Sequence, residues 1–142
     1  MGVVIDTSVL IAAEREVFDL PGFLTSLGDS AVALSAVTAS ELLHGVHRAK
    51  GAAARAQRSQ YVESILANIP ALPFGLREAC IHASIWATLA SKGQFIGAHD
   101  LLIAATALAM HSKVATLNRG EFARVPKLGM ASTEKFLRAS PR

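Results

Sequence analysis

The chain has 142 residues, of which 51% are hydrophobic and 18% are charged. This length suits one domain spanning residues 1–142, and the composition excludes a disordered tail or linker. Cys80 is the single cysteine, which excludes an internal disulfide and a cysteine-rich zinc site. We therefore expect a reducing, cytoplasmic setting and a buried Cys80. No apolar run approaches the roughly 20 residues of a membrane span, so we expect no membrane association.

The formal net charge is +3, and the basic residues are unevenly placed. One basic stretch covers residues 44–58, and a second runs from Lys113 to Arg142 and includes Arg119. Both stretches suit a polyanionic partner such as RNA, although a solvated surface that keeps the protein soluble would show the same pattern. The first basic stretch, 44–58, contains no acid and four cations, namely Arg48, Lys50, Arg55 and Arg58.

Hydropathy patterns along the chain predict strands that alternate with helices. Short runs rich in Val, Ile and Ala predict the strands, and apolar residues at helical spacing predict the helices. This alternation predicts an α/β fold with a central, mostly parallel sheet of four to five strands flanked by helices. Tyr61 and Trp86 are interpreted as core or interface residues rather than as a base-stacking site. In chain order, the pattern predicts a strand at Gly2–Asp6, helices at Thr7–Arg15 and Leu20–Leu27, a strand at Ala31–Ser35, helices at Thr38–His47 and Ala52–Leu66, a strand at Ala71–Phe74, helices at Leu76–Ala90 and His99–His111, a strand at Val114–Leu117, and an edge strand or loop at Val125–Gly129.

Three carboxylates stand among apolar residues, where an unpaired charge is costly to bury. They are Asp6, Glu41 and Asp100. Each has a local explanation. Asp6 could cap the helix that follows it, Glu41 has capping-box spacing to Thr38, and Asp100 lies in a first helical turn, where the helix dipole favours an acid.

The positions of the acids relative to the strands suggest a shared site instead. Carboxyl ends of parallel strands meet at one edge of a sheet, which is where ligands bind. Asp6 ends the first strand, Glu41 follows the second, Asp100 opens the helix before the last, and Glu121 follows the last. Four clustered carboxylates repel one another unless a cation is present. Oxygen ligands without cysteine or paired histidines favour Mg²⁺, with Mn²⁺ as a substitute.

Two other α/β classes fit the sequence poorly. A phosphate-accepting receiver domain needs an acidic pair after the first strand and an acceptor Asp after a later one, whereas Asp6 is unpaired and no later predicted strand ends in Asp. A nucleotide-binding domain is disfavoured because neither glycine-rich phosphate-binding motif occurs.

Four segments together resemble the PIN-domain family and, within it, the VapC-type toxins of bacterial toxin–antitoxin pairs. The resemblance covers nearly the whole chain, with the segments in the same order and at similar separations. The segments are Val4-Ile5-Asp6-Thr7-Ser8-Val9-Leu10, Ser35-Ala36-Val37-Thr38-Ala39-Ser40-Glu41-Leu42, Asp100-Leu101-Leu102-Ile103-Ala104-Ala105-Thr106-Ala107 and Thr116-Leu117-Asn118-Arg119-Gly120-Glu121-Phe122.

The resemblance implies a PIN-like three-layer fold and an Mg²⁺-dependent ribonuclease. In that family the acids matching Asp6, Glu41, Asp100 and Glu121 surround one or two divalent ions. Asp6 and Asp100 would be the metal ligands, with Glu41 and Glu121 acting through water. The fourth acid is often Asp in the family, so Glu121 is a departure. The residues matching Ser8, Thr116 and Asn118 would support the site.

The resemblance also implies partners. These are an RNA substrate, a cognate VapB-like antitoxin and a second copy of the chain in a homodimer. We expect the high apolar fraction, around Leu20–Leu27 and Ala52–Leu66, to leave a groove for an antitoxin helix. The alternative function is a non-catalytic interaction module of the same fold that binds RNA or a protein partner.

Overall fold

A computed structural model describes residues 2–139 of the chain. Arg142, the last residue of the basic C-terminal stretch, lies outside the described residues. Every predicted strand and helix before Lys113 is present, and so is the strand after it, with ends displaced by a few residues. Two short helices near the C-terminus were not predicted. The elements are β1 (Val3–Ile5), α1 (Thr7–Glu14), α2 (Leu20–Ser26), β2 (Val32–Ser35), α3 (Ala36–Arg48), α4 (Ala52–Asn68), β3 (Ala71–Leu72), α5 (Leu76–Ser91), α6 (Ala98–Ala109), β4 (Lys113–Ala115), α7 (Arg119–Phe122) and the 3-10 helix η1 (Glu134–Phe136).

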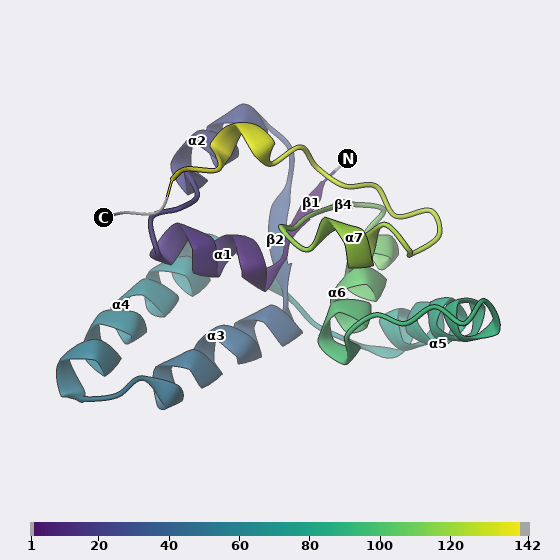
Figure 1. Ribbon diagram of the computed structural model, residues 1–142, viewed down its shortest axis with the longest axis horizontal. Helices are drawn as coiled ribbons and strands as arrows, with labels where there is room; N and C mark the ends of the chain where they lie inside the picture. Colours follow the sequence, from purple (N-terminus) through teal and green to yellow (C-terminus); the bar gives the residue numbers. More distant parts are fainter. Residues whose placement is uncertain (1, 140–142) are drawn as a thin grey trace.

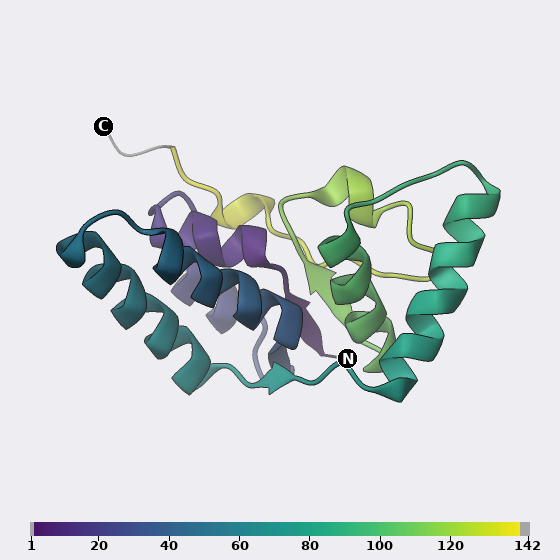
Figure 2. The ribbon, with the colours of Figure 1, turned by 90° about the horizontal axis from the view of Figure 1, so that it is seen from below.

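The four strands form one parallel sheet in the order β3-β2-β1-β4. Helices α1 to α4 lie on one side of this sheet and α5 and α6 on the other (Figures 1 and 2). The three-layer α/β prediction is therefore confirmed. The segment 125–129 forms turns rather than an edge strand, and the pairing at that edge is a single bridge between Met130 and Val114.

Successive side chains of β1 belong alternately to two hydrophobic cores, one on each face of the sheet. Val3 and Ile5 belong to the core beneath α1 to α4, while Val4 belongs to the core beneath α5 and α6. Successive strand side chains point to opposite faces, so a strand buried on both sides must be apolar throughout. This requirement explains why the run before Asp6 is continuously hydrophobic.

The chain's own C-terminal segment covers α2. The ring of Phe136 lies 5.4 Å from that of Phe23 and 6.2 Å from that of Phe18, centroid to centroid. The apolar surface expected to remain free at α2 is thus largely occupied from within the chain. Large apolar side chains that stay exposed lie elsewhere, among them Leu43 on α3, Leu76 and Trp86 on α5, and Phe95 in the loop between α5 and α6.

The buried position predicted for Cys80 was wrong, and of the core-or-interface interpretation of Trp86 only the core alternative is ruled out. Cys80 is exposed rather than buried, because it lies on the outer surface of α5. Trp86, on the same helix, has a relative exposure of 59% and is not a core residue. Within residues 2–139, no helix combines the length and the hydrophobicity required to cross a bilayer.

Candidate active site

Asp6 is a buried carboxylate at the carboxyl end of β1, with only 3% relative exposure. It occupies the N-cap position of α1, yet its side chain makes no capping bond. Its Oδ2 instead accepts hydrogen bonds from Ser8 Oγ at 2.6 Å and from Thr116 Oγ1 at 2.8 Å. The helix-cap interpretation is therefore wrong, and Asp6 belongs to a polar cluster built from two strand ends.

The parallel register of β1 and β4 explains how Thr116 reaches Asp6. Ile5 pairs with Ala115, and the Asp6 amide donates to the Ala115 carbonyl at 2.8 Å. The next residue on each strand therefore stands side by side. The two hydroxyls are themselves fixed, because Ser8 Oγ accepts from the Leu117 amide and Thr116 Oγ1 from the Asn118 amide.

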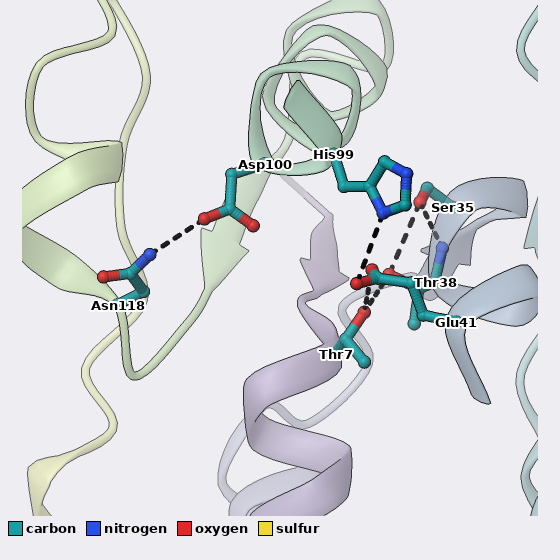
Figure 3. A network of polar contacts seen from close by, with 7 residues as sticks. All are labelled: Thr7, Ser35, Thr38, Glu41, His99, Asp100 and Asn118. Carbon is teal, nitrogen blue, oxygen red and sulfur yellow. Dashed lines mark hydrogen bonds and ion pairs between the residues drawn. The ribbon is translucent and has the colours of Figure 1, made fainter. Parts of the chain in front are cut away.

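Asn118 joins two further predicted acids. Its Nδ2 donates to Asp100 Oδ2 at 2.8 Å and to Glu121 Oε2 at 2.7 Å. Asp100 lies in the first turn of α6 and Glu121 in α7, which begins just after β4. Figure 3 shows Asn118 and Asp100 pointing toward each other across the gap between their elements. The short helix α7, which sequence patterns missed, thus brings Glu121 to Asp100.

The electrostatics of this cluster are those of crowded carboxylates. The pKa of Asp100 is raised to about 6 by its partial burial, by a hydrogen bond with Glu121 and by the negative charge of Asp6. The same hydrogen bond, together with Asn118, lowers the pKa of Glu121. The contact between the two carboxyls therefore raises the pKa of Asp100 and lowers that of Glu121. Because the negative charge of Asp6 also raises the pKa of Asp100, these two carboxylates are close enough to interact electrostatically.

Glu41 does not occupy the capping-box position that its spacing from Thr38 predicted. Helix α3 begins at Ala36, and Ser35 caps it by accepting from the Thr38 amide at 3.0 Å. Thr38 is therefore inside the first turn and Glu41 is one turn further along, so the capping-box interpretation is wrong. Glu41 Oε1 accepts from Thr7 Oγ1 at 2.7 Å, and Oε2 lies 3.5 Å from His99 Nδ1.

The predicted acids therefore form two neighbouring groups rather than one. His99 and Asp100 are adjacent on α6, but His99 points toward Glu41 whereas Asp100 points toward Asn118 (Figure 3). Across residues 2–139, no three His, Cys, Asp or Glu side chains are grouped so as to hold a metal ion. Sequence reasoning missed the contribution of Thr7, although its position directly after Asp6 at a strand end was a usable signal.

The predicted RNA-binding cations lie at two places, and three of them make intramolecular contacts. Arg58 pairs with Glu14 at 3.1 Å, and Arg119 with Glu134 at 3.6 Å. Arg55 donates to a backbone carbonyl at the end of α3. Arg48 and Lys50 are exposed at and just beyond the end of α3. Arg119 adjoins Asn118 in the chain, so it is the predicted cation nearest in sequence to the acids.

A pocket of about 230 Å³ lies between α1, α3 and α4 and reaches Glu41. Its lining combines apolar residues with charged ones, including Arg48 and the Glu14–Arg58 ion pair. Tyr61 also lines it and donates to the Leu10 carbonyl at 2.5 Å. Burial and the charge of Glu14 raise the pKa of Tyr61 to about 12. The pocket is thus a mixed polar and apolar depression beside the Glu41 group.

Comparison with known proteins identifies the family. The PIN domain family model matches residues 3–128. A protein of Rickettsia bellii named Ribonuclease VapC is 38% identical over 128 residues, which is 90% of this chain and 93% of that protein. The structure of VapBC2 from Rickettsia felis, bound to a DNA fragment from their promoter, superposes with a TM-score of 0.84 at 26% identity, covering 92% of this chain and 98% of that one.

A second solved structure covers still more of the chain. VapBC-5 from Mycobacterium tuberculosis, a member of the VapBC family of toxin-antitoxin systems, is 31% identical and superposes with a TM-score of 0.73 over 98% of this chain and 100% of that one. The match in sequence extends over nearly the whole fold and includes the strand ends that carry the acids. This chain therefore belongs to the PIN-domain family and, within it, to the VapC group.

Proposed function

We propose that this protein is an Mg²⁺-dependent ribonuclease that hydrolyses RNA phosphodiester bonds and acts as the toxin of a VapBC-type pair. One observation carries the proposal. Asp6 lies at the end of β1 and Asp100 in the first turn of α6, and the two carboxylates are close enough for the charge of Asp6 to raise the pKa of Asp100. The names of the relatives supply the substrate class, since they are called ribonucleases.

The donor chemistry of the site fits a hard divalent cation. The polar side-chain atoms around Asp6 and Asp100 are oxygens, apart from the amide nitrogen of Asn118, which donates a hydrogen bond to Asp100. Mg²⁺ is bound through one or two carboxylates and substrate phosphates in such sites. Asp6 and Asp100 would hold it, with Glu121 and Glu41 contributing through water. Bound Mg²⁺ would neutralise phosphate charge and acidify the attacking water.

The chain's own residues would prepare the carboxylates. Ser8 and Thr116 fix the rotamer of Asp6, because both donate to the same oxygen and are fixed in turn by backbone amides. Asn118 holds Asp100 against Glu121 despite their repulsion. Groups held this way lose little freedom when a substrate binds, which is how positioning lowers a barrier. With water as nucleophile, the products carry a 5′-phosphate and a 3′-hydroxyl.

Partners follow from the same family membership. We propose a VapB-like antitoxin, a homodimer of this chain, and action in the cytoplasm. The pocket between α1, α3 and α4 is a suitable place for an antitoxin side chain, because it is partly apolar and ends at Glu41. A basic antitoxin side chain reaching the carboxylates would oppose cleavage through a charge-assisted hydrogen bond.

Two experiments test the proposal. Purified protein should cleave single-stranded RNA with Mg²⁺ or Mn²⁺ and stop cleaving in EDTA. Equal cleavage in EDTA would remove the metal from the mechanism, and an absence of cleavage under all conditions would favour the non-catalytic interaction module.

Induction in a bacterial host should arrest growth, and co-expression of the neighbouring reading frame should rescue growth and yield a complex. Sequencing RNA 5′ ends after brief induction would identify the target.

A further inference from the structure

The short helix α7 carries Glu121 but has little stability of its own. It is a single turn, Arg119–Phe122, and its second residue is Gly120. The first turn of a helix is costly to form, and glycine is among the weakest helix formers. Of the four side chains only that of Phe122 is buried. The contact between Glu121 and Asp100 also brings two carboxyls together, which repel each other when both are ionised. The helix therefore depends on contacts with the rest of the fold to keep Glu121 in place.

Arg119 makes such a contact from the first position of α7. Its Nη1 donates to the Ala131 carbonyl at 2.9 Å, and its Nε lies 3.6 Å from Glu134 Oε1. The Arg119 side chain keeps only 37% relative exposure. A guanidinium presents its donors in a rigid fork, so two acceptors on different nitrogens fix its orientation. Nε and Nη1 are thus directed at the protein itself.

Both acceptors belong to a segment that is anchored at each end, residues 130–138, which we call the C-terminal strap. Near its start, the Ala131 amide donates to the Val114 carbonyl on β4 at 2.8 Å. At its end, the Arg138 amide donates to the Val17 carbonyl at 2.8 Å. Figure 1 shows the strap in yellow, running from the loop that follows α7 to η1 beside α2. A segment held at both ends offers α7 a fixed support.

The contact is transmitted to the acids through the neighbouring residue Asn118. The Nδ2 of Asn118 donates to both Asp100 and Glu121, and its backbone amide donates to Thr116 Oγ1 at 2.9 Å. The backbone around Asn118 is therefore held on one side by the end of β4 and on the other by the link between Arg119 and the strap. Displacement of α7 would move Asn118 and Glu121 together.

A second use of Arg119, as a cation that contacts RNA, competes with this one. An arginine that recognises phosphate presents its donor fork to the ligand, whereas Nε and Nη1 of Arg119 already face acceptors within the chain. The carboxylate of Glu134 beside the guanidinium would also repel a phosphate. By contrast, Arg48 and Lys50 are exposed to solvent. The contacts of Arg119 therefore favour an internal role.

We infer that Arg119 is a positioning residue of the carboxylate cluster, which holds α7 to the C-terminal strap so that Asn118 and Glu121 face Asp100. The inference rests on the proposed function for its effect on cleavage, while the holding of α7 is independent of that function. Arg119 acts through α7 and not by touching the RNA.

Hydrogen–deuterium exchange in EDTA, followed by mass spectrometry, tests the holding of α7 without any cleavage. In the full-length Arg119→Met variant, which keeps an unbranched apolar side chain, the amides of segment 119–125 should exchange roughly 10-fold faster than in the wild type. That factor corresponds to the loss of one hydrogen bond to a charged group. The amides of α5 should exchange as before. Unchanged exchange in segment 119–125 would overturn the inference.

Cleavage kinetics separate positioning from contact with RNA. Arg119→Met should lower kcat roughly 10- to 100-fold, as loss of a residue that orients a ligand does, with KM nearly unchanged. If Arg119 instead holds a phosphate, KM should rise and the salt slope of RNA binding should fall by about 1, and the inference is wrong. Arg119→Lys keeps a cationic donor and should restore exchange protection and kcat together. Recovery of one without the other would break the link between them.

Two further variants act on the strap. Glu134→Gln removes one partner of an exposed ion pair, which is worth little, so kcat should fall less than in Arg119→Met and KM should stay at the wild-type value. A lower KM with unchanged kcat would mean that Glu134 masks an RNA-binding arginine, contrary to the inference. Lys135→Met is the matched control, because Lys135 is an exposed cation on the same segment. It should leave both kcat and the exchange of segment 119–125 unchanged.

The positioning role and the proposed function fail differently. If the wild-type protein cleaves no RNA, the nuclease function is wrong, and exchange in Arg119→Met still decides whether Arg119 holds α7. If the wild type cleaves RNA and Arg119→Met matches it in both exchange and kcat, only the positioning role is wrong.

Discussion

The hydroxyl of Thr116 donates to Asp6 Oδ2 at 2.8 Å, although 110 residues separate the two along the chain. The contact exists because β1 and β4 are neighbours in parallel register, with Ile5 opposite Ala115. Ser8 donates to the same carboxylate oxygen. Asp6 is thus positioned by one residue from its own helix and one from the far end of the sequence.

The first prediction concerns this contact. Thr116→Val removes the hydroxyl at nearly constant shape and should slow RNA cleavage roughly 10- to 100-fold, as loss of a residue that orients a ligand typically does. Stability should fall by about 1–3 kcal/mol, because buried polar partners lose a hydrogen bond. Cleavage rates and urea unfolding measure the two effects. Thr116→Ser keeps the donor and serves as the control, and a Val variant that cleaves at the wild-type rate would contradict the positioning role.

A second prediction concerns the two proposed metal ligands. Asp6→Asn and Asp100→Asn should each reduce cleavage by orders of magnitude, since each removes a charge that would bind the cation. Both variants should fold, because they relieve repulsion between carboxylates. Circular dichroism checks the fold, and cleavage of single-stranded RNA with Mg²⁺ checks the activity. Full activity in the folded Asp100→Asn protein would remove Asp100 from the site.

Glu41 provides a third prediction. Glu41→Gln keeps an oxygen that can accept from Thr7 but removes the charge. Because the residue is not a capping partner, the melting temperature should change little, whereas cleavage should fall substantially if the carboxylate acts on water or metal. Thr7→Val is the companion variant, since it frees Glu41 without altering its charge. Unchanged cleavage by Glu41→Gln would limit Glu41 to a structural role.

The fourth prediction is a pH dependence of stability. The pKa of Asp100 is about 6 in the folded protein, against about 3.9 in an unfolded chain. The folded state therefore binds the extra proton, so the contribution of Asp100 to stability is fully present below about pH 4 and is lost as the pH rises through 6. In EDTA, Asp100→Asn should melt above the wild type at pH 8 and show a much smaller advantage at pH 4.5.

Thermal melts of both proteins across this range decide the matter. The comparison needs metal-free buffer, because a bound cation would favour the ionised carboxylates and hide the effect. An advantage of Asp100→Asn that is constant with pH would mean that neither burial nor the neighbouring acids raise the pKa of the Asp100 carboxyl.

Local sequence patterns were sufficient to predict most of the fold. The apolar run before Asp6 predicted a strand buried on both faces, and helical spacing of apolar residues predicted α1 to α6, because a strand or helix must bury its apolar side chains wherever it finally lies. The order of acids after strands also placed Asp6, Asp100 and Glu121 at one edge, since parallel strands share their carboxyl ends.

The contacts of each acid were decided only by the tertiary structure. Sequence spacing made Asp6 a helix cap and Glu41 a capping-box partner, and both interpretations were wrong. A carboxylate bonds to whichever donors the assembled fold brings to it, and Thr116 and Thr7 come from elements that spacing cannot relate to these acids. The exposure of Trp86 has the same origin, because which face of α5 is covered depends on where α6 packs and not on the helix's own sequence.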